Sequence, residues 1–159
     1  DLNGPLRKVA ELLGPQAASQ GIEVRLPLKK DPLLIHADPD QLQQVFLNLC
    51  LNAIQAMPQG GRLTISSSST GSRPDPGEAM DQQGVHVTVA DTGAGIPPEN
   101  LRRIFEPFFT TKDPGKGTGL GLALSRAIVM EHGGQIEVES RVGKGSHFHV
   151  YFPRKPAEG

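Results

Sequence analysis

Apolar side chains recur at helical spacing in three stretches of the chain. These are residues 2–20, 38–57 and 120–131. Apolar positions three and four residues apart lie on one face of a helix, so each stretch predicts an amphipathic helix. Asp38 and Asp40 are candidate N-cap residues for the second helix, with Pro39 in its first turn. Gly21 and Gly133 end the first and the third helix.

Shorter stretches alternate between apolar and polar positions, which is typical of strands. They cover residues 22–28, 33–37, 63–65, 85–89, 136–140 and 146–152. The 63–65 strand is expected to end in the serines at 66–69. Residues 69–83 predict an exposed loop, and residues 98–104 one or two helical turns. Five or six strands with three main helices predict a single α/β (α+β) two-layer sandwich with the helices on one sheet face.

Composition narrows the class of protein. The 159 residues carry 16 Lys and Arg against 17 Asp and Glu, a balance that gives no support to a nucleic-acid partner. One cysteine, Cys50, excludes a disulfide framework and a cysteine-based zinc site. No apolar run reaches the about 18–20 residues of a membrane span. Gly and Pro, 19 and 14 residues, are in excess, which predicts either disorder or loops that approach a ligand.

Asp91 ends the fourth apolar alternation and shares its parity with Val85, Val87 and Val89. It therefore points toward the core, where a carboxylate is costly unless it is hydrogen-bonded. The turn at 92–97, with two glycines, lets backbone come close to a ligand. A carboxylate beside such a turn suits an exocyclic amine such as that of adenine. The alternative is a strand-end Asp that caps the next turn.

Asn48 and Asn52 lie one turn apart on the second helix, at the edge of its apolar stripe. Neutral amide oxygens suit Mg²⁺, which binds through few protein groups plus phosphates. The alternative is that both are ordinary solvated polar residues.

The Gly-rich stretch at 115–122 opens the third helix, and free amides at a helix start favour anions. A P-loop is excluded because Gly117, not Ser or Thr, follows Lys116. A dinucleotide fingerprint is excluded because no buried strand precedes the glycines. The alternative is a flexible loop leading into a helix.

Gly143–Phe148 forms a last group with possible chemistry. Ser146 has the parity of Phe148 and faces the core side, where it could meet Asp91 or a ligand. His147, His149 and Tyr151 share the opposite face. A solvated strand face is the favoured interpretation, and a His-x-His metal site, with no third ligand in view, is the other.

In order and spacing, five of these motifs together resemble the catalytic ATP-binding domain of sensor histidine kinases. They correspond to the family's N, G1, F, G2 and G3 boxes: NLCLNA at 48–53, DTGAGI at 91–96, FEPFFTTK at 105–112, GTGLGL at 117–122 and GKGS at 143–146. The FEPFFTTK motif is most similar to that of the nitrogen-regulation type of sensor kinase. The resemblance covers about residues 1–153. It implies the Bergerat fold shared with gyrase-type topoisomerases, heat-shock chaperones and mismatch-repair ATPases, with a mixed, mostly antiparallel sheet of about five strands.

The resemblance also implies roles for single residues. Asn52 would be the Mg²⁺ ligand, with Asn48 near the metal and the phosphates. Asp91 would accept from the adenine amino group, Gly95 would let the purine approach, and Ser146 would support adenine recognition through water. An ATP lid is implied at about 98–118, hinged and anchored by Phe105, Phe108 and Phe109, with the amides of Gly117, Gly119 and Gly121 as phosphate cradle. The other implied nucleotide contacts are Gly93, Ile96, Thr110, Thr111, Lys112, Lys116, Thr118, Leu120 and Leu122.

Two departures from the family pattern concern positive charge near the phosphates. Gln55 stands where some members have Lys, and Thr110 where some have Arg. Lys112, Lys116 or Arg103 could replace that charge, and the choice among them stays open. Of these, Lys112 is taken as a catalytic residue, together with Asn48.

The implied function is binding of Mg-ATP and transfer of its γ-phosphate to a histidine on a separate dimerisation and phosphoacceptor helix, with a response regulator downstream. None of the five histidines precedes an acidic residue, as the family's acceptor does. We therefore expect a cytoplasmic catalytic fragment, monomeric on its own, from a homodimer that could be membrane-anchored. The alternatives are a chaperone-type module that hydrolyses ATP and a non-catalytic nucleotide sensor. Asn48 stands where ATPases of this superfamily tend to carry a Glu base, which favours transfer.

Overall fold

The computed structural model describes residues 1–30, 32–70, 84–107, 109 and 121–153. Five strands form one sheet in the order β1-β2-β3-β5-β4. Strand β1 runs parallel to β2, and the other neighbours are antiparallel. The elements are α1 (Asn3–Ser19), β1 (Ile22–Arg25), α2 (Pro39–Gln55), β2 (Gly61–Thr70), β3 (Gly84–Asp91), α3 (Pro98–Leu101), α4 (Gly121–Glu131), β4 (Gln135–Arg141) and β5 (Gly145–Pro153).

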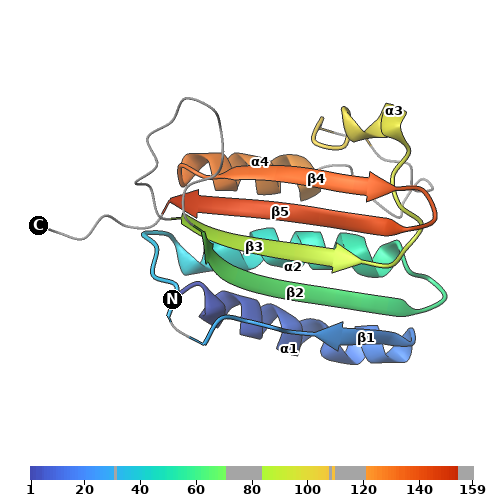
Figure 1. The fold of residues 1–159 in the computed structure, drawn as a ribbon, viewed down its shortest axis with the longest axis horizontal. Helices are drawn as coiled ribbons and strands as arrows, with labels where there is room; N and C mark the ends of the chain where they lie inside the picture. Colours follow the sequence, from blue (N-terminus) through green and yellow to red (C-terminus); the bar gives the residue numbers. More distant parts are fainter. Residues whose placement is uncertain (31, 71–83, 108, 110–120, 154–159) are drawn as a thin grey trace, which may run out of the picture.

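Helices α1, α2 and α4 all lie on one face of the sheet, while α3 sits beside the edge at the end of β4 (Figure 1). The opposite face of the sheet carries no helix in the described part of the chain. The expected two-layer sandwich with a mixed, mostly antiparallel sheet is therefore confirmed. None of the described helices is long and apolar enough to cross a membrane.

Helix α2 begins where the sequence predicts. The Asp38 carboxylate accepts hydrogen bonds from the backbone N–H groups of Asp40 and Gln41, at 2.9 and 3.3 Å. Asp38 is thus the N-cap, and Asp40 lies in the first turn, where its charge meets the positive end of the helix dipole. The apolar face of α2 is fully buried through Leu42, Val45, Phe46, Leu49, Cys50, Ala53 and Ile54.

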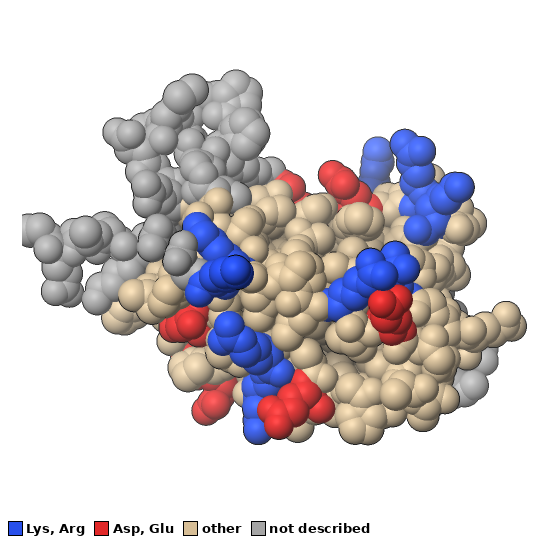
Figure 2. Space-filling view, turned by 60° about the horizontal axis from the view of Figure 1, so that its bottom comes forward, with Lys and Arg blue, Asp and Glu red and all other residues tan. Residues whose placement is uncertain are grey.

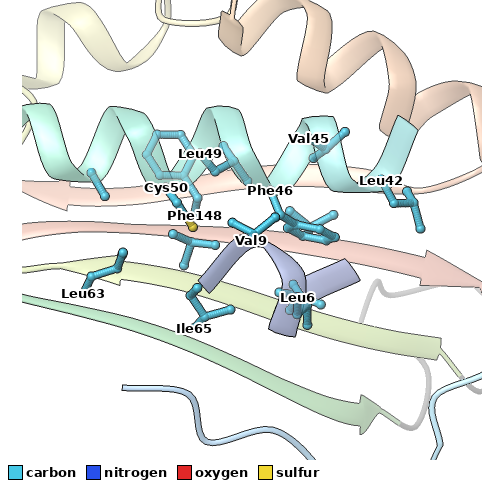
Figure 3. Packing of buried hydrophobic residues seen from close by; sticks show 14 of the residues in the cluster. Leu6, Val9, Leu42, Val45, Phe46, Leu49, Cys50, Leu63, Ile65 and Phe148 are labelled. Atoms are coloured by element: carbon cyan, nitrogen blue, oxygen red, sulfur yellow. The ribbon is translucent and has the colours of Figure 1, made fainter. Parts of the chain in front are cut away.

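The core lies between this face of α2, the inner side of α1 and the inward residues of the sheet (Figure 3). Leu6 and Val9 of α1 meet Phe46 of α2 there, above Ile65 of β2. Burying each such side chain stabilises the fold by about 1.5–3 kcal/mol. Cys50 is part of this core, and burial raises the pKa of its thiol to about 12. The cysteine is therefore a neutral packing residue.

Two strand predictions were wrong, and the strand predicted at 22–28 is shorter, since β1 ends at Arg25. Residues 33–37 form no strand, because Leu33 instead pairs its backbone with the start of α1: its N–H donates to the Asp1 carboxylate and its carbonyl accepts from Leu2. Strand β2 does not end at the serines but continues through 66–69, and three of these four serines pair with Thr88, Val87 and Val85 of β3, the fourth with His86. Pairing with a β-branched neighbour outweighs the weak strand preference of serine. The predicted loop at 69–83 falls mostly outside the described residues.

Candidate functional site

Asp91 and Ser146 face one another at one end of the sheet, where β3 ends and β5 begins. Both residues are 4% exposed. The Asp91 carboxylate accepts a hydrogen bond from the backbone N–H of Gly93 at 2.8 Å and another from the backbone N–H of Ser146. The prediction that Asp91 points into the core is confirmed, and of the two possibilities left open for Ser146, its backbone meets Asp91.

The surroundings of Asp91 change its ionisation. Burial raises the pKa of its carboxyl, and the hydrogen bonds from Gly93 and Ser146, with the nearby His147, lower it by less. Two backbone donors hold the carboxylate in a fixed direction without neutralising it. A buried acceptor of this kind is suited to a neutral donor group such as an aromatic amine.

The turn after Asp91 is held between α2 and the β4–β5 hairpin. The N–H of Ala94 donates to the carbonyl of Ala56, and its carbonyl accepts from Gly143. A Cβ at Gly93 would collide with the carbonyl of Ala56, and one at Gly95 with the carbonyl of Arg141. These two glycines thus have a packing role that sequence reasoning missed: backbone approaches backbone there. Their predicted nucleotide contacts remain predictions.

Ser140 is a residue that sequence reasoning missed. Its hydroxyl accepts from the backbone N–H of Ile96 at 2.7 Å, donates to the carbonyl of Gly145 at 3.0 Å and lies 2.8 Å from the Ser146 hydroxyl. One hydroxyl therefore connects the Asp91 turn, β4 and β5. Its place opposite Ser146 in the β4–β5 register was not predicted, because strand order cannot be read from local patterns.

Asn48 connects α2 to the first turn of α4. Its side-chain amide donates to the carbonyl of Gly121 at 3.5 Å and to the Ser125 hydroxyl at 3.4 Å. Ser125 is completely buried and donates in turn to the carbonyl of Gly121 at 2.8 Å. Asn48 and Gly121 thus lie together, and their nucleotide contacts remain predictions. Asn52 is half-buried one turn further along α2, and Leu122 is half-buried beside Gly121.

Phe105 anchors the segment after α3 to the core. Its ring meets that of buried Phe148 edge to face, with the centroids 6.4 Å apart, and the Arg126 guanidinium lies 5.7 Å from its centre. Arg103 covers the Phe109 ring at 4.6 Å and pairs with Glu106 at 3.4 Å. Such cation–π pairs hold the segment in place. The contact between Arg126 of α4 and Phe105 was not predicted from the sequence.

Several predicted site residues lie outside the described part of the chain: Phe108, Thr110, Thr111, Lys112, Lys116, Gly117, Thr118, Gly119 and Leu120. Their roles remain predictions. Within the described residues, no three His, Cys, Asp or Glu side chains gather to hold a metal ion. The half-buried amides of Asn48 and Asn52 fit Mg²⁺, since this ion is bound in many sites by few protein oxygens, waters and substrate phosphates.

Comparison with known proteins identifies the class to which this fold and site belong. Residues 37–156 match the family described as histidine kinase-, DNA gyrase B-, and HSP90-like ATPase. The chain is 44% identical over 148 residues to sporulation kinase A of Bacillus subtilis, covering 93% of this chain and 22% of that protein. It thus spans about a fifth of the length of this relative.

Solved structures agree. The catalytic domain of histidine kinase ThkA superposes with a TM-score of 0.79 and 36% identity, covering 98% of this chain and 96% of that one. The structure of ThkA in complex with response regulator protein TrrA has a TM-score of 0.75 and 32% identity, and the match covers 100% of this chain and 42% of that one. The structure of full-length ShkA in complex with AMPPNP has a TM-score of 0.79 and 35% identity, and the match covers 96% of this chain and 30% of that one. This chain belongs to the histidine kinase-, DNA gyrase B-, and HSP90-like ATPase family, and within it to the catalytic ATP-binding domains of sensor histidine kinases.

Proposed function

We propose that this chain binds Mg-ATP and delivers the γ-phosphate to a histidine on a phosphoacceptor helix in two-component signalling. The observation that carries the proposal is the buried Asp91 carboxylate, fixed by the N–H groups of Gly93 and Ser146. Adenine presents an exocyclic N–H₂ donor, whereas guanine presents a carbonyl at the corresponding position. The Asp91 carboxylate can accept a hydrogen bond from the adenine amino group, whereas it repels the guanine carbonyl oxygen. The match to ShkA, solved with AMPPNP, supports the same ligand class.

The residues of α2 and α4 would act on the triphosphate. When bound, Mg²⁺ would neutralise phosphate charge, and Asn52, with Asn48 beside it, would hold it through amide oxygens. Asn48 also donates to Gly121 and Ser125, so the start of α4 is tied to the metal-binding helix. Phe105 would anchor the lid at about 98–118. Lys112, Lys116 or Arg103 would supply the cation at the γ-phosphate. These residues position and neutralise reactants, which is most of the catalysis in phosphoryl transfer.

Transfer is favoured over hydrolysis because Asn48 occupies the position of a general base. A neutral amide cannot take a proton from water, whereas a glutamate can. The receiving group would then be the histidine, and not water. The match to ThkA bound to response regulator TrrA supports a response regulator as the downstream partner. We place the protein in the cytoplasm and, within a longer chain, in a homodimer that the phosphoacceptor helices form.

A transfer assay in trans tests the proposal. The chain is incubated with γ-labelled ATP, Mg²⁺ and the separately prepared phosphoacceptor domain of a similar sensor kinase. The expected result is acid-labile label on that domain, absent when its histidine is replaced. The chaperone-type alternative predicts release of labelled phosphate with none on the acceptor, and this result would contradict transfer. Binding without transfer or hydrolysis would favour the nucleotide-sensor alternative.

A further inference from the structure

The helix-free face of the sheet carries a group of ring side chains on β3 and β5. In the strand register His86 lies opposite Tyr151, and Thr88 lies opposite His149. The His86 and Tyr151 rings stack with their centroids 4.5 Å apart and an angle of 8° between their planes. His149 is half-buried, with 16% of its side chain exposed. These side chains are therefore held by their neighbours and do not form the simple solvated face that the alternation predicts.

Three polar atoms of this group form a triangle. His86 Nε2 lies 3.0 Å from His149 Nδ1, and the Thr88 hydroxyl lies 3.1 Å from the first and 3.2 Å from the second. An imidazole nitrogen has one in-plane direction for its proton or lone pair, so it cannot point directly at both of its neighbours. Two ligands of one tetrahedral Zn²⁺ at about 2.0–2.1 Å lie about 3.3 Å apart. The triangle is within a few tenths of an ångström of that spacing.

Glu139 supplies the second feature of a metal site. Among the described residues, His149 Nε2 is buried without a hydrogen-bond partner, and the Glu139 carboxylate lies 3.6 Å from it. Metal-binding histidines usually direct their other ring N–H to a carboxylate or carbonyl, which leaves the ligating nitrogen without a proton.

We propose that His86 Nε2 and His149 Nδ1, with the Thr88 hydroxyl, bind a divalent transition-metal ion of the Zn²⁺ or Cu²⁺ type. Imidazole nitrogen suits these ions, whereas Mg²⁺ prefers oxygen ligands. Water completes the coordination. With the His149 proton on Nε2 toward Glu139, the proton between the two rings belongs to His86 Nε2 and moves to His86 Nδ1 when the ion binds, so both imidazoles stay neutral. The His-x-His pair suggested by the sequence is thereby replaced by a cross-strand pair. Asp91 is buried on the other face of β3, so this site is separate from the proposed nucleotide site.

Calorimetric titration of the tag-free chain with zinc chloride, in a non-chelating buffer, tests this inference. We expect one saturable binding event per chain and none of similar affinity with magnesium chloride. His86→Ala and His149→Ala should each weaken zinc binding at least about tenfold, the loss of one good ligand. His36→Ala, at an exposed position outside the strands, is the matched control and should leave the affinity unchanged. Absence of saturable binding, or an equal loss in the His36 control, would overturn the proposal.

A measurement on the unmodified chain separates metal binding from misfolding of a variant. Nitrogen chemical shifts of the five histidine rings are followed by NMR as zinc is added. The proposal requires large shifts at His86 Nε2 and His149 Nδ1. Shifts confined to the exposed His147, whose ring lies 6.2 Å from that of His149, would place the metal elsewhere and overturn it.

Discussion

Asp91 and Ser146 are directly opposed residues of two antiparallel strands, and the backbone N–H of Ser146 donates to the Asp91 carboxylate. Strand β3, which supplies the carboxylate, is therefore hydrogen-bonded to β5, whose backbone orients that carboxylate. The Gly93 N–H completes the arrangement from the following turn. This local geometry explains why a charged group can be retained in the core, and why its ionisation reports on the site.

The buried carboxylate predicts a specific pH dependence of stability. The folded-state pKa of Asp91 is raised above its ordinary value of 3.8, so the folded protein binds this proton more tightly than the unfolded chain does. The contribution of Asp91 to the free energy of unfolding is thus largest below pH 3.8 and is lost as the pH rises through the folded pKa. Asp91→Asn removes this dependence. Urea unfolding of both proteins across this range should show the variant gaining stability relative to the unmodified chain as the pH rises. A constant difference at all pH values would show that Asp91 has no raised pKa.

Gly95 and Gly143 have nearly equal φ angles, 78° and 79°, but different surroundings. A Cβ at Gly143 would meet no atom of the described residues within 4 Å, whereas one at Gly95 would strike the Arg141 backbone. Gly143→Ala should cost about 1–2 kcal/mol, the strain of a left-handed conformation. Gly95→Ala should cost about 2–5 kcal/mol, because overpacking adds to that strain. Chemical denaturation of the two variants measures the difference. Equal losses would mean that Gly95 is required for its torsion alone.

Asn52→Ala tests the proposed Mg²⁺ ligand. If the amide oxygen holds the ion, Mg²⁺ should raise the ATP affinity of the unmodified chain but not that of the variant. Each 1.4 kcal/mol that the ion contributes to binding corresponds to about a tenfold difference in Kd. ATP titrations with and without Mg²⁺ measure that gain. Gln44→Ala, at an exposed position of α2, is the matched control and should retain it. An Asn52 variant with the full Mg²⁺ effect, or with intact transfer to an acceptor, would assign the metal to another residue.

The sequence predicted what depends on local pattern and not what depends on strand pairing. Helix α2, its Asp38 cap and the inward direction of Asp91 follow from periodicity and capping chemistry. The continuation of β2 through Ser66–Ser69 does not, because pairing with β3 supplies it. The role of Ser140 was missed for the same reason, since β4 and β5 had to be placed side by side before its contacts could be seen.

The surface gave less information than the core. Lys and Arg side chains adjoin Asp and Glu side chains at several places on the face shown in Figure 2. Separately, Glu23 forms ion pairs with Arg25 and Arg62 at 2.9 and 3.3 Å, and all three side chains are about half-exposed. Exposed pairs of this kind contribute little to stability, because solvent screens them, and they indicate no ligand. This mixed pattern is consistent with the nearly balanced composition.

The most direct test of the central claim is the base preference of the unmodified chain and of Asp91→Asn. Calorimetric titration with ATP and with GTP, each with Mg²⁺, measures it. We expect saturable ATP binding, weaker GTP binding, and a loss of about 10- to 100-fold in ATP affinity in the variant, equivalent to one charge-assisted hydrogen bond. The variant should also lose the preference for ATP, because an amide can donate to the guanine carbonyl. No binding of ATP at millimolar concentration, or an unchanged preference in the variant, would contradict the account.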